Sequence, residues 1–295
     1  MAEKSFGTGL RAEDFEAHRP HLRAVAYRML GSLAEAEDAV QETWLRAGAA
    51  DVGEVRNIGG WLTTIATRTC LNALRSRVAR REEELQTSHG TDRPDHSPTP
   101  EQEVEAADAV GIALLVVLDT LTPDERLAFV LHDLFAVSFD EIAAILERTP
   151  ASARQLASRA RRRIRGTSPA APDTSRRRRA VDAFLAATRT GDFEALVALL
   201  HPDVVLTADP AVIPSPERVV VLGAHTVAKG AMAATGRAQF TGPALLDGAY
   251  GLVMAPQGRL RVLLTFTTDP DSGLFTAIDV IAEPERLAAV EVTVA

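Results

Sequence analysis

The chain has 295 residues and a formal net charge of −8 at pH 7, and its length predicts two or three domains. Apolar residues make up 46% of it, which argues against wholesale disorder. The first residues lack the apolar stretch of a secretory signal. The longest apolar run, residues 110–118, is far shorter than the ~20 residues that span a bilayer. We therefore expect a soluble, cytoplasmic protein with no membrane partner.

Cys70 is the only cysteine, so neither an internal disulfide nor a thiolate metal cluster can form. It lies in an apolar helical pattern, where a small core residue is the usual role of a cysteine. We predict no metal site and no cofactor.

Charge is unevenly distributed along the chain. Residues 181–295 hold seven basic and thirteen acidic residues, a net charge of −6, whereas residues 1–180 carry −2. The densest basic cluster is TPASARQLASRARRRIR, residues 149–165, which has six arginines and no acid. A polyanion responds to such local clusters rather than to the net charge.

Two segments without a sustained apolar period divide the chain. One is charged and contains three prolines, and the other joins a Pro- and Ser-containing stretch to a run of four arginines. The predicted organisation is a helical domain at 10–81, a linker at 82–105, a second helical domain at 106–166, a linker at 167–179 and a mixed domain at 180–295.

The N-terminal domain is predicted to be wholly helical. Ser32 and Glu35 form a capping box at the start of one helix. In the next helix, the spacing predicts an inward stripe of Leu62, Ile65, Ala66, Thr69, Cys70 and Ala73. Another face combines an aromatic ring, a hydroxyl, guanidinium groups and an amide, which suit bases and phosphates: Trp61, Thr64, Arg68, Asn72 and Arg75. A solvated polar face anchored by Trp61 is the alternative.

The middle domain is predicted to contain a helix-turn-helix. Ser138 and Glu141 form a second capping box, and Thr149 with Pro150 suits the start of the following helix. One face of that helix is apolar: Ala153, Leu156, Ala157, Ala160 and Ile164. The other is polar and cationic: Ser152, Arg154, Gln155, Ser158, Arg159 and Arg162.

Such a helix suits the major groove of DNA. Arginine and glutamine read guanine and adenine there, and the later arginines meet phosphates. An ordinary solvated helix is the alternative, but a surface helix usually mixes signs of charge. We therefore predict nucleic-acid binding.

The C-terminal domain is predicted to pack helices on a curved antiparallel sheet. Residues 180–209 indicate two amphipathic helices followed by a strand. Residues 259–268 alternate between apolar and polar, and 273–283 and 288–294 are further predicted strands, with a turn at 255–258.

Three stretches resemble one family. HLRAVAYRMLGSLAEAEDAVQETWLR and GGWLTTIATRTCLNALR resemble region 2 of the extracytoplasmic-function (ECF) sigma factors of the sigma-70 family, the second stretch matching its promoter-melting part. Residues 121–165 are similar to that family's domain 4, which binds the −35 promoter element. The resemblance implies a promoter-specificity subunit of bacterial RNA polymerase and not an enzyme.

The resemblance also implies roles for residues. The helix around Asp38, Gln41, Glu42 and Trp44 would grip the clamp helices of the β′ subunit, and domain 4 would touch the β flap. Residues that would recognise and open the −10 element are Asn57, Trp61, Thr64, Arg68, Asn72 and Arg75. The turn of the helix-turn-helix usually carries glycine, whereas this chain has Glu147, and a left-handed backbone at a non-glycine costs roughly 1 kcal/mol.

The segment from His201 to Val204 looks like the SnoaL-like branch of the NTF2-like fold, an α+β cone that a group of ECF sigma factors carries at the C-terminus. Two motifs typical of that group are reduced here to residues 96–100 and 221–230, so the chain is similar to a divergent member. Its candidate general bases fall into no spacing that requires acid–base chemistry: His201, Asp203, Asp209, His225, Asp247 and Asp279.

We therefore expect a regulatory C-terminal domain that holds the DNA-binding faces closed until polymerase or a small-molecule ligand releases them. One alternative is an enzyme of the SnoaL or ketosteroid-isomerase type fused to a DNA-binding module. Another is a conventional repressor or activator that binds duplex DNA alone.

Overall fold

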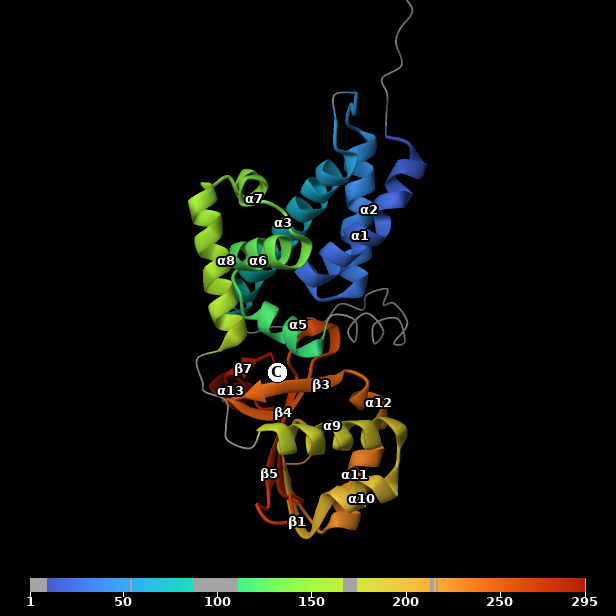
Figure 1. Cartoon of the computed structure of the whole chain (residues 1–295), viewed down its shortest axis with the longest axis vertical. Coiled ribbons are helices and arrows are strands. Elements are labelled where there is room, and N and C mark those ends of the chain that lie inside the picture. Colours follow the sequence, from blue (N-terminus) through green and yellow to red (C-terminus); the bar gives the residue numbers. More distant parts are fainter. Residues whose placement is uncertain are drawn as a thin grey trace, which may run out of the picture. The chain divides into compact units, whose positions relative to one another are not determined.

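The computed structural model describes residues 10–53, 55–86, 111–166, 174–212, 215 and 217–294. These form two compact units (Figure 1). The helical unit comprises Met1–Glu103 and Leu121–Arg161, and the sheet unit comprises Val104–Thr120 and Arg162–Ala295. Most of the predicted linker at 82–105 lies outside the described residues. Over the described part of the chain, no helix has the length and apolar character needed to cross a bilayer.

The first half of the helical unit is a three-helix bundle. Its helices pack against one another in all three pairings, and their bounds are α1 (Ala12–Leu30), α2 (Leu33–Gly48) and α3 (Ile58–Gln86). The Ser32 side chain accepts a hydrogen bond from the Glu35 backbone N–H, which fixes the start of α2. The Glu35 carboxylate contacts the Arg77 guanidinium on α3.

The predicted inward stripe of α3 is correct at its centre and wrong at its end. Leu62, Ala66 and Cys70 are buried, whereas Ala73 is exposed. Thr63 and Thr67, which the prediction left out, are buried. Their hydroxyls donate to backbone carbonyls one turn earlier, so the burial leaves no polar atom unpaired.

The second half of the helical unit contains the helix-turn-helix. Its elements are α6 (Pro123–Phe129), the π-helix η1 (Val130–Leu134), α7 (Phe139–Leu146) and α8 (Pro150–Arg165), whose last turn is counted with the sheet unit. The capping box of Ser138 and Glu141 is present. Glu147 ends α7 in the left-handed region, at φ 55° and ψ 44°. The turn therefore keeps the geometry that favours glycine, and Glu147 carries the strain.

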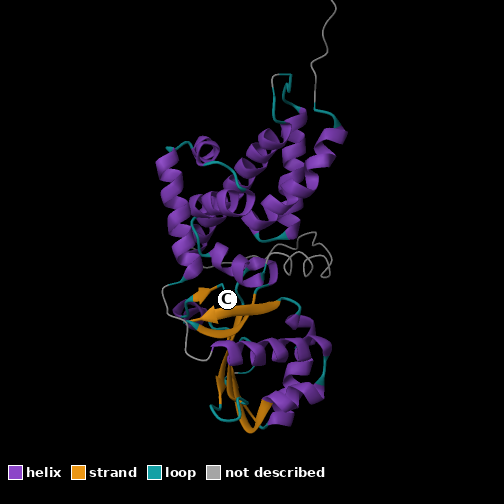
Figure 2. Cartoon of the chain, viewed as in Figure 1, coloured by secondary structure: helices purple, strands orange, loops and turns teal. Residues whose placement is uncertain are grey.

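The sheet unit contains a seven-stranded sheet of order β2-β1-β6-β5-β4-β3-β7. Its strands are drawn in orange in Figure 2. β1 and β6 pair in parallel and the other neighbours are antiparallel, so the predicted antiparallel sheet is mixed at one pair. The strands are β1 (Leu200–Ala208), β2 (Val219–Leu222), β3 (Thr241–Leu246), β4 (Ala249–Met254), β5 (Val262–Thr268), β6 (Phe275–Ile281) and β7 (Val292–Thr293).

Helices cover both faces of this sheet. One face packs against four of them: α9 (Thr174–Thr190), α10 (Phe193–Leu199), α11 (Ala224–Ala233) and α12 (Thr235–Ala238). The other face receives α5 (Ile112–Asp119), which contacts β3, β4 and β7. There Ile112 lies so close to Gly242 that a Cβ on the glycine would come within 3.0 Å of it. α5 is apolar all round, so it needs cover on every side. It belongs to the sheet unit although its residues lie in the predicted middle domain.

Two predicted boundaries in the sheet unit are wrong. Residues 174–179, expected to be linker, form the first turns of α9, and Arg176 in these turns donates hydrogen bonds to the carbonyls of Pro270 and Asp271. The predicted strand at 288–294 is shorter, since its first residues end the helix α13 (Pro284–Ala289). The turn at 255–258 contains a short 3-10 helix, η2 (Pro256–Gly258).

Candidate nucleic-acid interface

The polar face of α8 is open to solvent. Five of the six predicted −35 contacts are exposed and Ser152 is half-buried. Among the residues that the structure describes, Arg159 and Arg162 have no ion-pair partner, whereas Arg161 pairs with Asp133 at 2.7 Å. Unpaired guanidinium groups along one helix provide the positive surface that phosphates require.

The start of α8 is fixed by local contacts. The Ser152 backbone N–H donates to the Thr149 hydroxyl, as expected of an N-cap. The Arg154 guanidinium lies over the Phe139 ring, 5.5 Å from its centroid, so α7 helps to position it. These two contacts hold the first turn of α8 in place.

The predicted −10 residues form one stripe along α3. Their spacing of three or four residues places them on a single helical face. Arg68, Asn72 and Arg75 are exposed, and Trp61 and Thr64 are half-buried. Asn57 is exposed, and its side-chain oxygen accepts a hydrogen bond from Gly60 N–H, so it caps α3.

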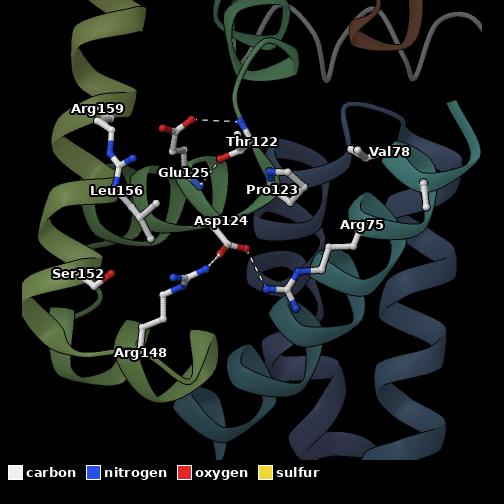
Figure 3. A pocket seen from close by; sticks show the side chains of 11 residues that line it. Arg75, Val78, Thr122, Pro123, Asp124, Glu125, Arg148, Ser152, Leu156 and Arg159 are labelled. Atoms are coloured by element: carbon white, nitrogen blue, oxygen red, sulfur yellow. Dashed lines mark hydrogen bonds and ion pairs between the residues drawn. The ribbon is translucent and has the colours of Figure 1, made fainter. Parts of the chain in front are cut away.

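Residues of α6 and α7 contact this stripe. The Arg75 guanidinium lies 2.9 Å from one carboxylate oxygen of Asp124, and Arg148, in the turn of the helix-turn-helix, lies 2.9 Å from the other (Figure 3). Arg68 donates to the Ala144 carbonyl at 3.3 Å. The α3 stripe is therefore held by hydrogen bonds to the helix-turn-helix half of the same unit.

A pocket of about 510 Å³ lies between these elements. Its wall includes Arg75 from the α3 stripe and Ser152 and Arg159 from α8 (Figure 3). A space of this volume takes a small molecule, not a DNA duplex. Residues predicted to contact two promoter elements therefore line one pocket, and this arrangement of the helical unit is called closed below.

The predicted polymerase-binding face of α2 is only partly free. Asp38 and Gln41 are exposed. Glu42 pairs with Arg46 at 2.8 Å, and the Trp44 ring packs on Phe15, 5.0 Å between centroids. Leu45, which the sequence prediction did not include, lies on the same side of α2 and is 61% exposed. Its position four residues after Gln41 places the two side chains next to each other on the helix.

Cys70 is a buried core residue, as predicted. Burial raises the pKa of its thiol to about 12. The thiolate, which is the reactive form, is therefore scarce at neutral pH.

Two candidate general bases of the sheet unit are neutralised by arginine. Asp209 is fully buried and pairs with Arg286 and with Arg218, the latter at 3.3 Å. It also accepts the backbone N–H groups of Ala282 and Glu283 at 2.9 and 3.1 Å. Burial alone would raise its pKa, but these hydrogen bonds and Arg286 hold it below the ordinary value. Asp279 pairs with the same two arginines.

Three other candidates have structural contacts. The His201 ring nitrogen accepts the Asp203 backbone N–H at 3.2 Å, and Asp247 accepts that of Glu291 at 2.8 Å. His225 lies beside the Phe193 ring. Within the described residues, no cluster of three His, Cys, Asp or Glu side chains could hold a metal ion.

Known proteins match both halves of the helical region. The family model for sigma-70 region 2 matches residues 15–80, and that for sigma-70 region 4 matches residues 112–164. The chain is 37% identical over 216 residues to the probable ECF RNA polymerase sigma factor SigI of Mycobacterium tuberculosis, which covers 72% of this chain and 73% of SigI. The chain belongs to the ECF sigma factors.

Two further matches, one of sequence and one of structure, are to a second relative. This ECF sigma factor is 44% identical over 210 residues to the ECF RNA polymerase sigma factor SigJ of M. tuberculosis. That match covers 68% of this chain and 65% of SigJ, slightly less than two thirds of the relative. The crystal structure of SigJ aligns at 32% identity over 94% of this chain and 98% of SigJ, with a TM-score of 0.45.

The expected fold class is confirmed. This ECF sigma factor has helical sigma regions and a C-terminal α+β domain built on the seven-stranded sheet. The match to region 4 begins in α5, so the first helix of region 4 is the one that packs on the C-terminal sheet.

Proposed function

We propose that this ECF sigma factor directs core RNA polymerase to promoters in the cytoplasm. The observation that carries the proposal is the order of its two matched regions, each with an exposed polar face of the chemistry that promoter DNA requires. SigI and SigJ are named as RNA polymerase sigma factors, which supports the same activity here.

Each region has a separate role in this proposal. The α2 face around Asp38, Gln41 and Leu45 contacts the β′ clamp. The α3 stripe recognises and opens the −10 element, where unpaired bases stack on Trp61 and meet Arg68. The polar face of α8 reads the −35 duplex through Arg154 and Gln155, and its later arginines contact phosphates.

We further propose that the closed helical unit is the resting form. Arg75 pairs with Asp124 in the closed form and contacts DNA in the open form, so the ion pair and the DNA contact exclude each other. Binding of polymerase to the α2 face would favour the open form if polymerase binds that form more tightly. The C-terminal domain then regulates opening and performs no catalysis. The arginine pairing of Asp209 and Asp279 supports this, because neither carboxylate is free to act as a base.

The test is promoter-dependent transcription by the purified full chain with core polymerase. We expect transcripts only when both are present. Gln155→Ala should reduce transcription from promoters that depend on the −35 element, and Arg68→Ala should reduce opening of the −10 element. A matched control is Arg80→Ala, an exposed arginine further along α3 and outside the stripe.

Two results would contradict the proposal. Tight binding to duplex DNA without polymerase, together with an absence of transcripts, would indicate a conventional repressor or activator. Turnover of a hydrophobic small molecule by the full chain would indicate the fused enzyme.

A further inference from the structure

The sheet unit encloses a second cavity, of about 380 Å³, that is separate from the DNA-binding surfaces. It lies between one face of the sheet and the helices α9, α11 and α12. All of its lining residues belong to the sheet unit, and six strands contribute to it: β1, β2, β3, β4, β5 and β6. The cavity is therefore built by the C-terminal domain alone.

The wall of this cavity is almost wholly apolar. Leu206, Val262 and Leu264 line it and remain partly exposed, although the core surrounds them. The hydroxyls of Thr188 and Thr241, the two buried threonines of the wall, already donate to backbone carbonyls. An apolar cavity without free polar groups does not retain water well and accepts apolar molecules instead.

The mouth of the cavity differs from its interior. Thr226, Gly230 and Arg237 line it and are exposed, which places the opening along α11 and α12. Arg237 is the only charged lining residue. In the described part of the chain, no carboxylate lies within ion-pair distance of its guanidinium. A charge of this kind at the edge of an apolar space orients a ligand with one anionic end.

We propose that this cavity binds a small organic anion whose apolar body lies against the sheet and whose acidic group lies at Arg237. The volume suits the proposal, because an apolar cavity of about 150 Å³ already binds benzene and this one is larger. The site binds and does not react. Neither a carboxylate nor an imidazole lines it, so it holds no general base.

The test uses two fluorescent probes that share one apolar body. Anilinonaphthalene sulfonate carries an anionic group, and phenylnaphthylamine is the same ring system without it. Both should bind the full chain and gain fluorescence. Arg237→Gln should weaken the sulfonate by about tenfold, the value of a charge-assisted hydrogen bond at a partly shielded site, and leave the neutral probe unchanged.

Two neighbours on β2 supply a matched pair of variants. Val221 lines the cavity, whereas Val220 points away from it and is 59% exposed. Val221→Trp should abolish binding of both probes, because the indole occupies their space, and Val220→Trp should bind them as the parent does. Thermal unfolding of each variant checks its fold. If Val221→Trp fails to fold, binding of the two probes to Thr226→Trp is measured instead. This substitution at the exposed mouth blocks entry to the cavity without changing the core.

Three outcomes would overturn the proposal. The first is that neither probe binds the parent chain. The second is that Val221→Trp, or Thr226→Trp if Val221→Trp does not fold, leaves binding of both probes unchanged. The third is that Arg237→Gln changes the affinity for both probes equally or for neither, because the inferred ligand would then have no anionic end at Arg237.

Discussion

The carboxylate of Asp124 forms the one ion pair that joins the α3 stripe to the helix-turn-helix among the described residues, and Asp124→Asn tests the closed arrangement. Its side chain is 16% exposed, whereas the two arginines that it joins are each 50% exposed. Arg148 and Asp124 both belong to the helix-turn-helix half, so their pair persists when the unit opens. Of the two ion pairs of Asp124, only the pair with Arg75 is lost on opening, so Asp124→Asn acts on the equilibrium between open and closed chains through that pair.

The size of the shift follows from that single pair. Exposed ion pairs contribute about 0.2–1 kcal/mol, and the shielding of Asp124 places this one in the upper half of the range. Because ~1.4 kcal/mol is a tenfold change, a loss of about 0.5–1 kcal/mol should increase the ratio of open to closed chains two- to fivefold. High salt should reduce the difference between variant and parent, since it screens the pair.

The assay is fluorescence transfer between dyes on cysteines introduced at Ala49, at the end of α2, and Ala151, on α8, both exposed. The natural Cys70 does not interfere, because its buried thiol has a pKa of about 12 and stays protonated at the pH of labelling.

The matched control is Asp140→Asn. Asp140 occupies the same position in the first turn of α7 as Asp124 in α6, is exposed, and forms no ion pair with the described residues. Equal transfer in the two variants would refute the role given to Asp124.

Three further predictions follow. Glu147→Gly should increase the free energy of unfolding by about 0.5–1 kcal/mol, because glycine adopts the left-handed backbone without strain; denaturant unfolding measures it, and Glu147→Ala, which keeps the strain, should show no gain. Asp209→Asn should lower that free energy by about 2–4 kcal/mol, as a buried charged partner is removed. Since the pKa of Asp209 is lower in the folded chain, its contribution is complete above the unfolded value of ~3.9 and is lost as the pH falls through the folded value; the variant should therefore lose less stability in acid than the parent, and equal slopes would contradict this. Leu45→Ala should weaken binding to core polymerase severalfold without changing thermal stability, and unchanged affinity would remove Leu45 from the proposed contact.

The helix-turn-helix could be predicted because its signals are local. The capping pair of Ser138 and Glu141 lies three residues apart, and the polar face of α8 follows from one helical period. The Arg75–Asp124 pair could not be predicted, because its partners are 49 residues apart in the chain and both look like ordinary surface charges.

Other errors have a similar origin. The threonines of α3 are buried because their hydroxyls bond to the preceding turn, which a count of apolar residues does not register. The composition of the four arginines at 176–179 suggested a linker. Arg176 nevertheless donates hydrogen bonds to backbone carbonyls that lie more than ninety residues further along the chain. The sequence of α5 indicates a helix buried on every side, but not the sheet that buries it.

The position of α5 changes how a shortened chain must be interpreted. Its apolar side chains are covered by the C-terminal sheet, and a deletion after Gly166 would remove that cover from a segment that belongs to the region 4 match. Such a truncation exposes α5, which lies in region 4 and packs on the C-terminal sheet. An inactive truncated chain would therefore not show whether the C-terminal domain is inhibitory. Point substitutions that leave the fold intact are the way to dissect this protein.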